Sequence, residues 1–427
     1  MAGRAATFTS PLAQELAPAV VERLMRYARV NTQSQRDRTG CPSTPGQLEL
    51  LEMLAAELRE VGLEDVDLDA NGYLFATLPG TGPVIGLLAH VDVSPDAPAE
   101  GVEPLVHEAY DGGRIALPKG GTVLDPERMP ELAAKAGHDL VTSSGDTLLG
   151  ADDKAGLAEI MSAVAHLAAH PELPRPTIRV GLLPDEEIGE GATLFDVEHF
   201  GARCAYTFDG SELGELQDET FTGAEVVVTI QGVDIHPGFA TGRMVNATRL
   251  AGRILAGLPA DQAPETTSER EGFIHPYEVS GDASQATVAM IVRDFEEDLL
   301  ERHVEIVRAI AERVAADEPR ARIEVTSRPQ YPNMRDHLAP FPEVVERAAE
   351  AIRREGIELI RTPIRGGTDG SQLSANGLPT PNIFTGGHEY HSVREWASVQ
   401  DMAAAAAVAV RLAEVWAEFA ESAAPPS

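Results

Sequence analysis

TIRVGLLPDEEIGEG, residues 177–191, joins an apolar run to two adjacent glutamates, Glu186 and Glu187. The run at residues 177–183 predicts a buried strand of a parallel sheet. Ligands of open α/β sheets bind in the crevice outside the carboxyl ends of the strands, so the acids after this strand are placed for chemistry. If Glu187 binds a metal ion, Glu186 points the other way and can handle a proton. The alternative is that Asp185, Glu186 and Glu187 form a solvated turn, since exposed acids are common.

The composition is that of a globular protein. A chain of 427 residues is too long for one ordinary hydrophobic core, so its length predicts two or three domains. Apolar residues make up 43% of the chain and charged residues 24%, which disfavours disordered and membrane-spanning classes. The 34 basic and 68 acidic residues give a net charge of −34, which repels nucleic acid and anionic membranes. Neither is expected as a partner.

Two features predict a cytoplasmic location. Residues 1–6, MAGRAA, lack the long apolar region of a signal peptide. Cys41 and Cys204 lie far apart in the sequence and offer no disulfide framework, which agrees with a reducing compartment.

Helical and strand patterns alternate over residues 1–223 and 329–427 and predict an α/β domain, with a mostly parallel central sheet and helices on both faces. Residues 94–147 have few periodic stretches and predict a long excursion. Helices are expected at residues 12–30, 47–61, 343–355 and 399–420, with a further amphipathic helix opening at Asp152. Strands are expected at residues 66–68, 72–78, 84–93, 177–183, 204–210, 357–362 and 381–384.

The pattern changes between residues 224 and 328. Strand, helix, strand, helix and strand follow one another there, which predicts a small α+β domain inserted into the first, with two helices on one sheet face. These elements are expected at residues 225–231, 245–258, 286–294, 299–316 and 321–327.

Residues of the types that bind metal ions recur at the ends of predicted elements. His90 follows a buried strand, and Asp92 points to the same side of an extended chain, where it can hold the second ring nitrogen of His90. Asp152 opens a helix, although capping of that helix could also explain an acid there. Asp209 ends another strand, and His391 follows a glycine-rich turn.

Together these residues suit a pair of divalent cations. Two histidines and three carboxylates form a ligand set that two zinc ions, or similar cations, would accept. Asp152 is the natural bridge between them. The two ions would share a water that becomes hydroxide near neutral pH and attacks a carbonyl, with Glu186 as the general base. The set is His90, Asp152, Glu187, Asp209 and His391.

The chain resembles the peptidase T family, the tripeptide-aminopeptidase branch of the aminoacylase and glutamate-carboxypeptidase superfamily of dinuclear zinc peptidases. The resemblance covers nearly the whole chain. Its metal-type motifs are those of the superfamily, and the long forms at residues 150–156 and 363–370 resemble this branch in particular. The segments that carry it are RYARVNTQS (26–34), HVDVSPD (90–96), LGADDKAG (149–156), PDEE (184–187), PIRGGTDG (363–370), FTGG (384–387) and YH (390–391).

The resemblance implies a role for each matching residue at the metal centre. His90 and Asp209 would hold one zinc ion, and Glu187 and His391 the other. Asp152 would bridge them, as the spacing also suggests. Asp92 would orient His90, and Glu186 would be the general base.

The resemblance also implies that the insert, residues 224–328, is a lid domain. His236 would stabilise the oxyanion at the attacked carbonyl, although a histidine beside a proline is often a turn residue. Asn246 and Arg365 would receive the C-terminal carboxylate of the peptide, and an ion pair with a surface acid is the alternative for Arg365. His388 departs from the family pattern and could compete for zinc or perturb Glu186.

These implications predict a metal-dependent aminopeptidase that releases the N-terminal residue from tripeptides. The alternatives are an N-acyl amino acid deacylase or a dipeptidase with the same metal site, and a catalytically silent relative that binds peptides. Two zinc ions are the expected cofactors, with cobalt or manganese as substitutes. A homodimer stays open, as does whether His236 serves its own or a neighbouring active site.

Overall fold

The computed structural model describes residues 7–37 and 40–423, so the predicted absence of a signal peptide at residues 1–6 lies outside the described residues. The chain divides into two compact units. Unit 1 comprises Met1–Asp218, Asp336–Thr362 and Thr368–Ser427, and unit 2 comprises Glu219–Arg335 and Pro363–Gly367. The insert predicted at residues 224–328 falls within unit 2. No helix of the described residues is long and apolar enough to cross a membrane.

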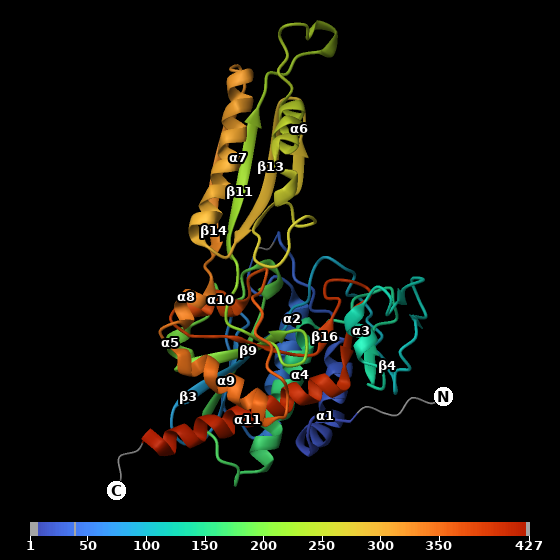
Figure 1. Cartoon of the computed structure of the whole chain (residues 1–427), viewed down its shortest axis with the longest axis vertical. Coiled ribbons are helices and arrows are strands. Elements are labelled where there is room, and N and C mark those ends of the chain that lie inside the picture. The colour runs from blue at the N-terminus through green and yellow to red at the C-terminus, as the bar shows by residue number, and fades with distance from the viewer. Residues whose placement is uncertain (1–6, 38–39, 424–427) are drawn as a thin grey trace. The chain divides into compact units, whose positions relative to one another are not determined.

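Unit 1 is built on a seven-stranded sheet of order β1-β2-β8-β3-β9-β15-β10, of which Figure 1 labels β3 and β9. The four consecutive strands β8, β3, β9 and β15 are parallel, whereas β1, β2 and β10 pair antiparallel with their neighbours. The α/β class is confirmed, and the sheet is mixed, with its parallel part in the centre. The strands are β1 (Glu64–Leu68), β2 (Leu74–Leu78), β3 (Val84–His90), β8 (Thr177–Leu183), β9 (Cys204–Gly210), β10 (Leu216–Gln217) and β15 (Asn382–Phe384).

Helices pack on this sheet in two groups. Helices α1, α4 and α11 contact one another, and α4 also contacts β3 and β9. A separate apolar cluster joins Leu88 of β3 and Ala205 of β9 to Phe200 of α5 and Leu373 of α10. The helices are α1 (Pro11–Tyr27), α2 (Pro45–Val61), α4 (Ala151–Ala169), α5 (Val197–Phe200), α8 (Met334–Leu338), α9 (Pro342–Arg354), α10 (Asp369–Ala375) and α11 (Val399–Ala423).

A second, antiparallel sheet of order β16-β17-β7-β4 takes two strands, β4 and β7, from the predicted long excursion and two, β16 and β17, from the chain after residue 386. Its strands have two or three residues, too short for an alternating pattern to be recognised. They are β4 (Leu105–His107), β7 (Leu140–Thr142), β16 (Gly387–His388) and β17 (Trp396–Ser398), and the same region holds β5 (Ile115–Ala116), β6 (Val123–Leu124) and α3 (Pro130–Ala134).

The strand predicted at residues 357–362 is wrong. This segment makes a single isolated bridge, from Ile360 to Glu215, because the edge strand β10 beside it has only two residues and offers little backbone to pair with.

Unit 2 is a four-stranded antiparallel sheet of order β12-β13-β11-β14 with two helices packed on it. Its core joins alternate residues of β11, such as Val226 and Val228, to Leu250 and Ile254 of α6 and to Val307 of α7. Strand β12 was not predicted, because it contains Pro276 and its second half is exposed. The elements are β11 (Thr222–Gln231), α6 (Ala247–Gly257), β12 (Phe273–Gly281), β13 (Gln285–Asp294), α7 (Glu297–Asp317) and β14 (Arg322–Tyr331).

Candidate metal centre

The parallel strands of unit 1 bring several predicted residues to one edge of the sheet. His90 is the last residue of β3 and pairs with Leu183, the last residue of β8. The chain after β8 turns through a short 3-10 helix, Glu186–Ile188, and Asp209 lies near the end of β9. Parallel pairing therefore places residues far apart in sequence at the same carboxyl edge.

Five ligand-type side chains form two groups that share Asp152. In one group the Nε2 atom of His90 lies 2.9 Å from Oδ1 of Asp152 and 3.7 Å from Oδ1 of Asp209. In the other, Nε2 of His391 lies 2.8 Å from Oε2 of Glu187 and 3.3 Å from Oδ2 of Asp152. Because the two oxygens of Asp152 face different imidazoles, this carboxylate is oriented as a bridge.

Asp92 contacts a residue of each ligand group, His90 in one and Glu187 in the other. Nδ1 of His90 lies 3.1 Å from the backbone oxygen of Asp92 and 3.4 Å from its Oδ1. The carboxylate of Asp92 also accepts the backbone N–H groups of Glu186 at 3.0 Å and Glu187 at 3.2 Å. A proton on Nδ1 would leave the Nε2 lone pair of His90 directed at Asp152 and Asp209.

The electrostatics of the site fit bound cations. Burial and the nearby Asp152 raise the pKa of Glu187 to about 8, and its Oε1 atom is buried without a hydrogen-bond partner among the described residues. Burial would also raise the pKa of Asp152, but hydrogen bonds from His391 and His90 hold that pKa below its usual value. Acids crowded in this way gain from a positive charge placed among them.

Two acids that support the site were not singled out as such from the sequence. Glu395 accepts the backbone N–H groups of Leu149, Gly150 and Asp152 at 2.8, 2.7 and 3.0 Å. Asp153 accepts the backbone N–H of His90 at 3.1 Å. Glu395 gave no signal because its partners lie at least 243 residues away in the chain, whereas Asp153 could be found from its place beside Asp152.

His388 belongs to neither of the two ligand groups. Its ring stacks on Trp396, with centroids 4.3 Å apart, and its Nδ1 lies 3.3 Å from Oγ of Ser211. It forms a different group with Glu212 and Asp401. Burial lowers the pKa of His388 to about 4.

The model of peptidase family M20/M25/M40 matches residues 147–415 of the chain. The chain belongs to this family. It is therefore a peptidase, and the resemblance to the peptidase T family is confirmed. Peptidases of this family are metal-dependent.

Similar proteins cover nearly the whole of this peptidase. Peptidase T of Bacillus licheniformis is 47% identical over 406 residues, which are 94% of this chain and 99% of the relative. Peptidase T of Bacillus velezensis is 46% identical over 406 residues, with the same coverage of 94% and 99%. The crystal structure of aminopeptidase PepT from Bacillus cereus superposes with a TM-score of 0.71 at 24% identity, covering 94% of this chain and 99% of that one, and shows a shared fold.

Three predicted site residues of the peptidase lie in unit 2. His236 is exposed, and its Nδ1 accepts the backbone N–H of Gly238 at 3.1 Å. Asn246 is the N-cap of α6, where Oδ1 accepts the backbone N–H of Arg249 at 2.9 Å. Arg365 donates to the backbone oxygens of Glu269 and Glu271 and to the Thr267 hydroxyl, at 2.7, 2.9 and 3.0 Å.

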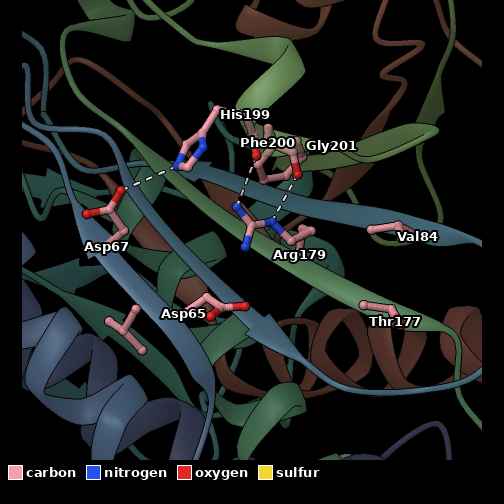
Figure 2. Close-up of a pocket in the computed structure, with 9 residues that line it drawn as sticks. Asp65, Asp67, Val84, Thr177, Arg179, His199, Phe200 and Gly201 are labelled. Atoms are coloured by element: carbon pink, nitrogen blue, oxygen red, sulfur yellow. Dashed lines mark hydrogen bonds and ion pairs between the residues drawn. The ribbon is translucent and has the colours of Figure 1, made fainter.

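A pocket of about 570 Å³ with a mixed polar and apolar lining lies at the other end of the central strands of the peptidase (Figure 2). Val84 and Thr177, the first residues of β3 and β8, line it, whereas the metal centre lies beyond the last ones. Arg179 also lines the pocket, and its guanidinium donates to the Phe200 carbonyl at 2.9 Å and to the Thr77 hydroxyl at 2.7 Å. That cation serves the fold, and the pocket is not part of the metal centre.

Proposed function

We propose that this peptidase is a cytoplasmic aminopeptidase that releases the N-terminal residue from tripeptides. The observation that carries the proposal is the pair of ligand groups sharing Asp152. The names of its relatives, peptidase T, support the substrate class. None of these relatives at 45–47% identity is named a deacylase or a dipeptidase, and two dipeptidases of similar fold are 12% and 13% identical to this chain.

The proposed centre holds two divalent cations, zinc or alternatively cobalt or manganese. His90 and Asp209 would hold one, Glu187 and His391 the other, and Asp152 would contact both. Such cations, when bound, polarise a carbonyl and lower the pKa of water.

Glu186 is the proposed general base. Burial, with Asp209, Asp369 and Glu187 nearby, raises the pKa of its carboxylate well above its usual value, so its affinity for a proton is high. Glu186 would take a proton from the attacking water and return it to the leaving amine. Its backbone is held by the carboxylate of Asp92.

Residues of unit 2 are proposed to recognise the peptide. Because Nδ1 of His236 accepts a hydrogen bond, the ring proton of a neutral His236 lies on Nε2 and can be donated to an oxyanion. Asn246 keeps its side-chain N–H groups after its cap bond, and the cationic Arg365 would add charge to bind the C-terminal carboxylate. We propose that unit 2 acts as a lid that measures peptide length.

The proposal is tested by the hydrolysis of leucyl-glycyl-glycine by the full chain with and without a chelator. We expect leucine release that stops on metal removal and returns when a divalent cation is added. A matched comparison with a dipeptide and an N-acetyl amino acid should show the tripeptide hydrolysed fastest. Activity that survives complete metal removal would rule out the mechanism, and a preferred N-acetyl amino acid would rule out the substrate class.

A further inference from the structure

A second group of metal-ligating side chains lies outside the proposed centre, between α1 and the end of α4. Glu15, His166 and His170 each offer one ligand atom, and these atoms all lie within 4.8 Å of one another. His166 is one turn before the end of α4 and His170 caps that end, so a spacing of four residues places both rings on one side of the helix.

The two imidazoles and the carboxylate converge from different elements. The rings of His166 and His170 have centroids 4.2 Å apart and an interplanar angle of 32°. Nδ1 of His166 lies 3.5 Å from Oε1 of Glu15 in α1. Helices α1 and α4 pack against each other, so a cation held by these three side chains would link the two helices.

One histidine already has the orientation of a metal ligand. Nδ1 of His170 lies 2.9 Å from the backbone oxygen of His166, so this nitrogen donates a proton and Nε2 keeps its lone pair. A ring nitrogen that donates to a backbone carbonyl is the usual support of a metal-bound histidine, since it fixes both the tautomer and the ring plane. Burial and the neighbouring His170 lower the pKa of His166, which favours the neutral ring that binds a metal ion, whereas the negative charges of Glu15, Glu172 and Glu414 act in the opposite direction.

We propose that Glu15, His166 and His170 bind a divalent transition-metal ion, with zinc as the expected ion. Two imidazole nitrogens and one carboxylate oxygen are a donor set for zinc, nickel or copper and leave a further position for water. The site is separate from the proposed centre, because Asp152 and His166 are roughly 20 Å apart along α4 at 1.5 Å per residue.

The test is zinc binding by the untagged full chain, measured as bound equivalents after equilibrium dialysis and as affinity by competition with a chelator. His170→Gln removes one ligand at a half-buried position and keeps about the size of the side chain. His199→Gln is the matched control, because His199 is an exposed histidine 3.3 Å from a single carboxylate, that of Asp67. Glu15→Gln, on the exposed side of α1, is a second variant in case His170→Gln does not fold.

We expect the wild-type chain and His199→Gln to bind one zinc equivalent more than His170→Gln, or to bind it at least about tenfold more tightly. Zinc should also raise the Tm of the wild-type chain more than that of His170→Gln, because the ion links α1 to α4. Peptidase activity at saturating metal should be equal in all three. Equal zinc stoichiometry and affinity in the wild-type chain, His170→Gln and Glu15→Gln would overturn the proposal. That comparison reads the same whether or not the centre at Asp152 binds metal.

Discussion

Glu186 and Glu187 are neighbours in the chain with different surroundings. The Glu187 carboxylate lies 2.8 Å from Nε2 of His391, whereas the Glu186 carboxylate makes no hydrogen bond or ion pair with the described part of the chain. Both backbones are held by Asp92. A single turn thus presents one carboxylate that is held in place and one that can exchange a proton.

The difference predicts the behaviour of Glu186→Gln. The amide keeps the shape of the side chain but cannot take a proton, so kcat should fall by about 10² to 10⁴ while metal content and Tm stay near wild type. Steady-state kinetics with leucyl-glycyl-glycine and elemental analysis measure both. The exposed Glu198 on α5 offers the control Glu198→Gln, which should keep full activity. A Glu186→Gln variant within a few-fold of wild type would remove this residue from the mechanism.

The contacts of Glu395 predict that Glu395→Gln has a different kinetic effect from Glu186→Gln. Its carboxylate accepts three backbone N–H groups around Asp152, and an amide has one oxygen and no charge for them. In Glu395→Gln the affinity for activating metal should fall by about 10- to 100-fold, with kcat largely restored at high metal concentration. Activity titrations with the cation measure this. Glu389→Gln, which removes an exposed pair with Arg394, should titrate like wild type, and an identical titration for Glu395→Gln would refute the positioning role.

Helix α4 carries a further buried acid, Glu159, seven residues after Asp152. Glu159 is fully buried, and neither carboxylate oxygen has a hydrogen-bond partner among the described residues. Burial, with Asp153 nearby, raises the pKa of Glu159 well above its usual value. The helix therefore holds a carboxyl group that folds more favourably when protonated.

The sign of the resulting pH dependence follows from the raised pKa. The folded chain keeps the Glu159 proton at a pH where the unfolded chain has lost it, so the pH-dependent cost of burying this residue is absent below about pH 4.3 and grows as the pH rises above that value. Glu159→Met replaces the group by an apolar side chain of similar volume. It should stabilise the chain by about 1–3 kcal/mol at neutral pH, with a smaller gain near pH 5.

Denaturant unfolding of Glu159→Met and wild type at both pH values measures the gain. Glu198→Gln serves as the control and should show no difference between the two pH values. A gain that is independent of pH, or a loss of stability, would contradict the account of Glu159.

The protein carries a large excess of negative charge. The sequence holds 68 acidic and 34 basic residues, so half of the acids would lack a cationic partner even if every base were paired. Many of the pairs present are exposed, such as Arg253 with Asp317 and Arg302 with Asp298, and exposed pairs contribute little. Repulsion among acids therefore works against the compact state.

This balance predicts that monovalent salt stabilises the protein. Raising KCl from about 0.05 to about 0.5 M shortens the screening length to below about 8 Å and weakens repulsion more than it weakens the exposed pairs. The Tm measured by differential scanning fluorimetry should rise. A series with potassium acetate at equal ionic strength separates screening from effects of the anion, and a fall in Tm in both salts would contradict the prediction.

The fold class and the family could both be predicted from the amino-acid sequence. Apolar runs such as residues 177–183 and 204–210 have the length of buried strands, and both are strands, β8 and β9. Parallel strands end at one edge, so ligand-type residues at those ends, such as His90 and Asp209, could be assigned to a common site before their contacts were known.

Some of the residues that hold the ligands of that site in place could be found only from the folded structure. Glu395 has no sequence signal, because a side chain that accepts backbone N–H groups needs only to be brought near them by folding. The same holds for His388, which meets Glu212 and Asp401 rather than the two ligand groups. It also holds for Glu15, which meets His166 and His170 from a distant segment of the chain. The strands β16 and β17 have two and three residues, too few to show an alternating pattern. Local sequence determines which elements form and where they end, whereas packing decides which side chains meet, because those contacts depend on the three-dimensional path of the whole chain.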